Sequence, residues 1–135
     1  SVLDIGCGTG LAGAAFRPHC QHLTGIDISG EMIRRAEAKG IYDRLLTGEV
    51  TAILEQERKA YTLIIAADVT SYIGDLTLFL AAVAARLAAD GTLLLTALEP
   101  APGEAPGIGP DGAARVRTEA GLVSLHAAHI QPIER

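Results

Sequence analysis

Residues 2–10 read Val-Leu-Asp-Ile-Gly-Cys-Gly-Thr-Gly, an apolar run that leads directly into three alternating glycines. Because glycine has no Cβ, glycines in a turn let the backbone approach a ligand and let the following helix pack close to the sheet. The pattern predicts a strand at Val2–Ile5, a helix over Leu11–Phe16 and a ligand-binding turn between them. A tight turn without a ligand is the alternative, since G-x-G-x-G alone is a short motif.

Short apolar runs and helical patterns alternate along the rest of the chain, which is typical of βαβ units and a parallel sheet. Most of the runs are apolar throughout, as expected of strands that helices cover on both faces. With 135 residues, the chain has the usual size of one domain. We therefore predict a single α/β domain over residues 1–135 with a doubly wound, mainly parallel sheet. The expected strands are Val2–Ile5, Leu23–Asp27, Leu45–Thr47, Tyr61–Ala66, Thr92–Leu98 and, weakly, Ile130–Ile133.

Two longer helices are indicated by apolar residues at the 3.6-residue period and by residues suited to their ends. Leu76–Ala89 follows Asp75, a suitable N-cap, and precedes Gly91, which suits the end of a helix. Gly30–Lys39 follows Ser29 in the same way. Residues 99–114 contain four prolines and four glycines, which predicts a long loop.

The charge balance argues against a nucleic-acid or membrane partner. Eleven Lys and Arg against sixteen Asp and Glu give a net charge of -5, and no basic run is longer than a pair. The longest apolar stretch, Leu78–Ala85, is far shorter than the roughly 20 residues of a membrane span.

Two cysteines are too few for a disulfide scaffold, so a cytoplasmic protein is expected. The His pairs near residues 19–22 and 126–129 lack a fourth ligand, so no metal site is expected.

Two carboxylates follow the second and third expected strands. The ends of neighbouring parallel strands lie side by side, so Asp27 can accept hydrogen bonds from both hydroxyls of a ribose. The alternative is that Asp27 only caps the following helix. Glu49 lies at the same edge and could accept from an exocyclic amine of a base. It could equally open a short helix over Thr51–Gln56, where the helix dipole favours a carboxylate.

The pattern of glycines and lysines narrows the choice of nucleotide. A P-loop is excluded because neither Lys39 nor Lys59 stands where G-x-x-x-x-G-K-[ST] requires a lysine. Residues 8–13 do read G-x-G-x-x-G, as in dinucleotide-binding proteins. That fingerprint normally begins at the end of the strand, however, and when the count starts at Gly6 its third position is Leu11. Although this register argues against dinucleotide binding, a nicotinamide-linked oxidoreductase is the main alternative among enzymes.

The chain resembles the class I S-adenosylmethionine-dependent methyltransferases from Val2 to about Leu98. The stretch VLDIGCGTG looks like their first motif, LTGIDISGEMIRRAEAKG like their second strand and helix, and TGEV like their third motif. Two later stretches, AKGIYDRL and AADVTSYIGDL, are more weakly similar to bacterial methyltransferase domains that accompany tetratricopeptide repeats. The resemblance implies a sheet of order 3-2-1-4-5 and S-adenosylmethionine as cofactor.

The resemblance also implies roles for single residues. The cofactor residues would be Asp4, Gly6, Cys7, Gly8 and Gly10 around its amino-acid end, Asp27 at the ribose, and Ile28, Met32, Glu49 and Val50 around the adenine. Because Cys7 stands between two glycines, we expect it to serve packing rather than nucleophilic catalysis.

The fourth motif of the family falls after the fourth expected strand, on the substrate side. It lacks the Asn/Asp-Pro-Pro-Tyr pattern of the enzymes that methylate amino groups of nucleic acids, which disfavours base methylation. Asp68, Thr70 and Tyr72 are the candidates for holding or deprotonating an acceptor, with Asp68 as the candidate base. The alternative is that Asp68 only caps the connection after the fourth expected strand. The acceptor is expected to be a small molecule or a protein, and no nucleic acid is expected.

Two further expectations concern the extent and the class of the protein. Relative to the family pattern, the chain starts at the first strand and ends near the sixth, so we expect a domain that is truncated at both ends, with an incomplete sheet. A cofactor-binding module without catalysis is the alternative from another functional class.

Overall fold

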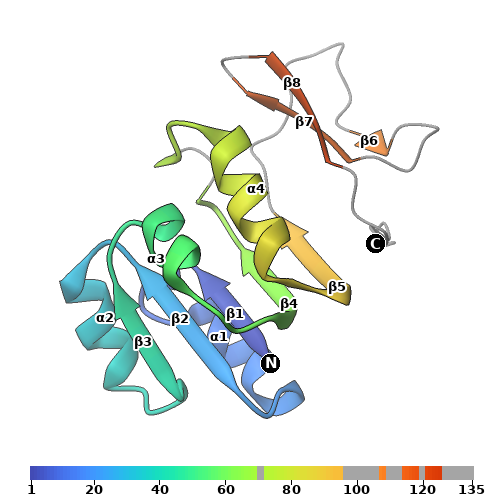
Figure 1. Ribbon diagram of the computed structural model, residues 1–135. Coiled ribbons are helices and arrows are strands. Elements are labelled where there is room, and N and C mark those ends of the chain that lie inside the picture. The colour runs from blue at the N-terminus through green and yellow to red at the C-terminus, as the bar shows by residue number, and fades with distance from the viewer. Residues whose placement is uncertain (70–71, 96–106, 109–113, 119–120, 126–135) are drawn as a thin grey trace.

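A five-stranded parallel sheet forms the centre of the fold (Figure 1). The computed structural model describes residues 1–69, 72–95, 107–108, 114–118 and 121–125. The spatial order of the strands is β3-β2-β1-β4-β5, and each neighbouring pair is parallel. Their bounds are β1 Val2–Ile5, β2 Leu23–Asp27, β3 Arg44–Thr47, β4 Tyr61–Ala66 and β5 Leu87–Leu95. The predicted fold class and the order 3-2-1-4-5 are confirmed.

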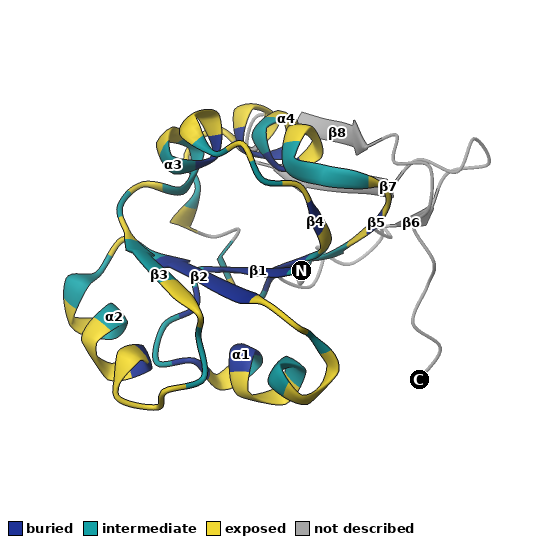
Figure 2. Ribbon diagram, turned by 60° about the horizontal axis from the view of Figure 1, so that its bottom comes forward, coloured by how far each residue is buried: buried dark blue, intermediate teal, exposed yellow. Residues whose placement is uncertain are grey.

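Helices cover both faces of this sheet, as the apolar strands require. Figure 2 shows α3 (Val50–Gln56) and α4 (Leu76–Arg86) on one face and α1 (Leu11–Phe16) and α2 (Gly30–Glu37) on the other. A short 3-10 helix, η1 (Arg17–His19), follows α1. The described residues up to the end of β5 therefore form three layers, with the parallel sheet in the middle.

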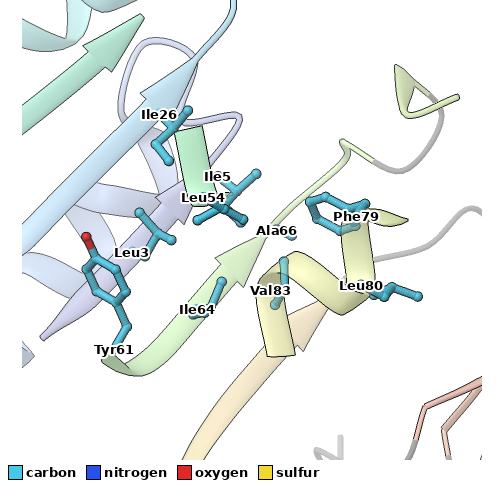
Figure 3. Close-up of a cluster of buried hydrophobic side chains, with 10 residues drawn as sticks. All are labelled: Leu3, Ile5, Ile26, Leu54, Tyr61, Ile64, Ala66, Phe79, Leu80 and Val83. Carbon is cyan, nitrogen blue, oxygen red and sulfur yellow. The ribbon is translucent and has the colours of Figure 1, made fainter. Parts of the chain in front are cut away.

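Strand β1 contributes side chains to both faces because successive residues of a strand point in opposite directions. Leu3 and Ile5 belong to the larger apolar cluster beneath α3 and α4, which Figure 3 shows. Val2 belongs to a smaller cluster with Leu23 and Ile65, against which α1 packs. The glycine-rich turn therefore starts from a strand that is fixed on both sides.

The predicted starts of α2 and α4 are correct, with Asp75 as the N-cap of α4, but both helices end earlier than predicted, α2 at Glu37 rather than Lys39. The Ser29 hydroxyl accepts a hydrogen bond from the N–H of Met32, and Gly40, at φ 64°, follows the end of α2. Helix α4 ends at Arg86 rather than Ala89, because Leu87 pairs with Tyr61 in the sheet. The predicted strand start at Thr92 is wrong for the same reason, and Gly91 lies within β5.

The prediction of one long loop over residues 99–114 is also wrong. Strand β6 (Gly107–Ile108) pairs antiparallel with β7 (Ala114–Thr118), which in turn pairs with β8 (Gly121–Leu125). The predicted sixth strand, Ile130–Ile133, lies outside the described residues.

In the part of the chain that the structure describes, every helix is too short or too polar to cross a membrane.

Candidate functional site

A pocket of about 970 Å³ lies where β1 and β2 end and the segment after β4 begins. In a sheet of this order the chain turns to opposite sides after β1 and after β4, and ligands bind at such switch points. Nine of the predicted site residues line this pocket. They are Gly6, Gly8, Asp27, Ile28, Met32, Glu49, Val50, Asp68 and Tyr72.

The glycine-rich turn supplies one wall of the pocket. Gly6 has φ 64°, in the left-handed region that favours glycine. A Cβ built on Gly6 would lie 2.0 Å from Cγ1 of Val69, so the segment after β4 packs directly on the turn. Gly6 and Gly8 both line the pocket, so the main chain of the turn borders it beside Val69.

Asp27 connects the turn to the end of β2. Its Oδ2 accepts a hydrogen bond from the N–H of Gly8 at 2.8 Å, and its Oδ1 accepts one from the N–H of Ser29 at 2.8 Å. The interpretation that Asp27 caps the following helix is wrong, because its bond goes to Ser29, and the Ser29 hydroxyl is the group that caps α2. Each carboxylate oxygen has a further lone pair, and the side chain lines the pocket.

Glu49 caps α3, as the second interpretation of this residue predicts. Its two oxygens accept hydrogen bonds from the N–H groups of Thr51 and Ala52, at 2.9 and 2.8 Å. Partial burial raises the pKa of Glu49, but these two hydrogen bonds outweigh it, so the pKa lies below the ordinary value. The carboxylate is charged and lies at the pocket wall near Val50.

Three predicted cofactor residues lie behind the turn instead of in the pocket: Asp4, Cys7 and Gly10 are buried, and none of them lines it. Burial, together with the nearby Asp4 and Asp27 carboxylates, raises the pKa of Cys7 to about 12, so its thiol stays protonated. This placement agrees with a packing role for Cys7.

The opposite wall comes from the segment between β4 and α4. Asp68 has φ 55°, and a non-glycine residue in this region carries backbone strain, which occurs most often at functional sites. Tyr72 is 88% exposed and Leu78 is 60% exposed, and both line the pocket. Thr70, the other predicted acceptor residue, lies outside the described residues.

The charge of the pocket is negative. Asp27, Glu49, Asp68 and Asp75 line it, and none of its described lining residues is Lys, Arg or His. Three further lining residues were not predicted from the sequence: Ile73 and Asp75, just before α4, and Leu78, in its first turn. Carboxylates with an apolar wall and a bare main chain suit a cation that carries an adenosine, as S-adenosylmethionine does.

The same chain segments match known methyltransferases. Residues 3–93 match the model of the family described as "Methyltransferase domain", which is more than half of the chain. Nodulation protein S from Rhizobium tropici is 33% identical over 79 residues, which are 56% of this chain and 32% of that protein. This chain spans less than a third of the curated relatives that it matches.

Solved structures give the same result. An S-adenosylmethionine-dependent methyltransferase from Clostridium acetobutylicum is 26% identical, with a TM-score of 0.60, over 67% of this chain and 39% of that one. The N-methyltransferase NodS from Bradyrhizobium japonicum, in complex with S-adenosylhomocysteine, is 28% identical, with a TM-score of 0.54, over 64% of this chain and 46% of that one. The cofactor prediction, S-adenosylmethionine, is confirmed by these relatives. By sequence and by fold, this chain belongs to the methyltransferase domain family.

Proposed function

We propose that the protein binds S-adenosylmethionine in the pocket at the carboxyl edge of the sheet and transfers its methyl group to a small-molecule or protein acceptor. The observation that carries this proposal is the joint position of Gly6, Gly8 and Asp27 on one pocket wall. Asp27 would accept hydrogen bonds from the ribose hydroxyls, and Ile28, Met32 and Val50 would cover the adenine, beside Glu49. When bound, S-adenosylmethionine supplies a methyl group that its positively charged sulfur activates for displacement.

The proposed reaction is an in-line displacement. An acceptor atom forms a bond to the methyl carbon while the bond from that carbon to sulfur breaks, and sulfur keeps the electron pair. S-adenosylhomocysteine is the product, and an acceptor nitrogen or oxygen passes its proton to Asp68 or to water. The protein contributes mainly alignment of the reacting atoms, which is worth up to about 7–11 kcal/mol in favourable cases.

The acceptor class follows from the wall around Asp68. Tyr72, Ile73 and Leu78 offer apolar surface there, and no basic side chain among the described lining residues could pair with a phosphate. An acceptor that is neutral or positively charged and partly apolar fits this wall, which disfavours nucleic acid. NodS is described as an N-methyltransferase, so a nitrogen atom is the first acceptor to test.

The cytoplasm is the compartment that we propose for this reaction. Cys7 and Cys20 are both free thiols in the structure, as a reducing compartment requires.

Calorimetric titration of the purified protein with S-adenosylmethionine, S-adenosylhomocysteine and NAD tests the cofactor. We expect binding of the first two and none of NAD. NAD binding without S-adenosylmethionine binding would overturn the proposal in favour of an oxidoreductase.

Incubation of cell extract with the protein and an isotopically labelled methyl donor then identifies the acceptor. A protein that binds the donor but labels no acceptor is a cofactor-binding module without catalysis.

Two substitutions of Asp68 distinguish the contribution of its carboxylate to catalysis from the effect of its backbone conformation on stability. With the identified acceptor, we expect Asp68→Gly to lower kcat by about a hundredfold or more, because the proton acceptor is lost, while the Kd for S-adenosylhomocysteine stays within about threefold. Asp68→Ala should lose the same activity and unfold at lower temperature than Asp68→Gly, because alanine at φ 55° costs about 1–2 kcal/mol. An unchanged kcat in Asp68→Gly would exclude Asp68 as the base.

A further inference from the structure

Tyr42 and Asp4 form a polar pair behind the glycine-rich turn, outside the pocket. The Tyr42 hydroxyl donates a hydrogen bond to Oδ2 of Asp4 at 2.7 Å. Asp4 is 1% exposed, and neither residue lines the pocket. Tyr42 comes from the segment between α2 and β3, so the contact joins parts of the chain that are 38 positions apart.

The Tyr42 ring lies where three glycines lack side chains. A Cβ on Gly13, within α1, would lie 2.2 Å from the Tyr42 hydroxyl oxygen. A Cβ on Gly25, in the middle of β2, would lie 2.9 Å from Cε1 of the ring, and one on Gly10 would lie 3.0 Å from Cε2. Contacts under 3 Å leave no room for a methyl group. Gly13 and Gly25 therefore make space for Tyr42, and Gly13 does so at a position that resembles part of a dinucleotide fingerprint.

Asp4 spans the two ends of the turn. It is the third residue of β1, before the turn, and the backbone N–H of Gly13, after the turn, helps to lower the pKa of its carboxyl group. Tyr42 holds the carboxylate in this position from a third segment. A buried carboxylate needs such donors, because an unpaired one is costly to bury.

We propose that Tyr42 is a positioning residue for cofactor binding: through Asp4 it holds the glycine-rich turn in the conformation in which Gly6 and Gly8 face the pocket. This inference rests on the proposed function, since it concerns how the same pocket binds its cofactor. It assigns Asp4 a supporting role in place of the direct cofactor contact that the resemblance to the methyltransferase family implies.

Comparison of Tyr42→Phe with Tyr61→Phe tests the proposal. Both changes remove one hydroxyl that donates to a carboxylate, because Tyr61 donates to Oε2 of Glu57 at 3.2 Å. Tyr61 is fully buried at the opposite end of β4, away from the pocket. We expect Tyr42→Phe to raise the Kd for S-adenosylhomocysteine about tenfold, within the range for a hydrogen bond to a charged group, and Tyr61→Phe to change it less than twofold.

Amide hydrogen exchange of the ligand-free protein gives a second readout that a general loss of stability would not produce. In Tyr42→Phe we expect faster exchange confined to the turn and the start of α1, and in Tyr61→Phe no change there. Asp4→Asn should reproduce the pattern of Tyr42→Phe. The carboxylate of Asp4 is charged and has two acceptor oxygens, whereas the amide of asparagine is neutral and has only one.

The pH dependence gives a third readout. Burial raises the pKa of Asp4, the hydrogen bonds from Tyr42 and Gly13 lower it, and the Asp27 charge raises it. The nearby Cys7 thiol stays neutral. Without the Tyr42 hydroxyl the pKa of Asp4 rises further, so the loss of affinity on acidification should begin at a higher pH in Tyr42→Phe than in the wild type.

Equal effects of Tyr42→Phe and Tyr61→Phe on the Kd and on exchange of the turn would overturn this inference while leaving the proposed function intact. A wild-type protein that binds no S-adenosylhomocysteine would instead overturn the proposed function. In that case, faster exchange of the turn in Tyr42→Phe alone would still support the positioning of the turn by Tyr42, and unchanged exchange would refute it.

Discussion

Asp27→Asn is expected to raise the Kd for S-adenosylhomocysteine by about a hundredfold or more, although the side chains of aspartate and asparagine have the same shape. Both oxygens of Asp27 accept backbone hydrogen bonds, from Gly8 and from Ser29. Asparagine has one acceptor oxygen and one NH2 group, so in either orientation its NH2 faces a backbone N–H. The turn then loses a charge-assisted bond, worth about 1.5–3 kcal/mol, and the ribose loses its anionic partner.

Comparison with Asp27→Ala distinguishes the effect of placing an NH2 group against a backbone N–H from the effect of losing the hydrogen bonds of the carboxylate. Alanine removes the carboxylate but places no donor against the two N–H groups, which water at the pocket wall can satisfy. Both variants should therefore lose affinity, and the ligand-free Asp27→Asn protein should be no more stable than the alanine variant. Thermal unfolding without ligand, measured beside the titrations, checks the second expectation.

Asp43→Asn is the matched control for Asp27→Asn. Oδ2 of Asp43 also accepts a backbone hydrogen bond, from Leu23 at the start of β2, and it pairs with Arg17 at 2.6 Å. These two partners lower the pKa of Asp43, so its contribution to stability is present at neutral pH and is lost as the pH falls through the folded-state pKa. We expect this control to lower the unfolding temperature at pH 7 and to leave the Kd unchanged. A Kd for Asp27→Asn within threefold of the wild type would contradict the role of Asp27.

The features that could be predicted from the sequence are those set by neighbouring residues. The strand and turn at residues 2–10 and the Ser29 cap each depend on a few consecutive positions. Asp27 could be predicted as well, because parallel strands bring their carboxyl ends to one edge of the sheet. The alternation of strands and helices predicted the parallel sheet, whereas the strand order came from the resemblance to the methyltransferase family.

The features that could not be predicted depend on contacts between distant segments. The helical pattern of α4 continues through Leu87, but pairing with Tyr61 in the sheet takes this residue into β5. Tyr42 carries no local motif that would link it to Asp4. The glycines at 13 and 25 were the available signal, because glycine inside a helix or strand indicates close approach of another group.

Gly6→Ala is expected to destabilise the protein by about 2–5 kcal/mol and to abolish cofactor binding at ordinary ligand concentrations. Two costs add at this position. Alanine at φ 64° costs about 1–2 kcal/mol, and its methyl group would meet Cγ1 of Val69 at 2.0 Å, an overlap that typically costs about 1–3 kcal/mol. Relief of the overlap would move the segment after β4 or the turn itself, and both line the pocket.

Gly40→Ala separates the two costs. Gly40 has the same φ of 64°, and a Cβ there would have no neighbour within 4 Å, so its substitution measures the backbone cost alone. The difference between the two alanine variants in free energy of unfolding therefore measures the overlap with Val69. The double variant Gly6→Ala/Val69→Ala should recover that difference and not the backbone cost, as a double-mutant cycle in chemical denaturation would show. If Gly6→Ala were no more destabilising than Gly40→Ala, Val69 would not pack against the turn, and the pocket would lack the wall from which Asp68 is presented.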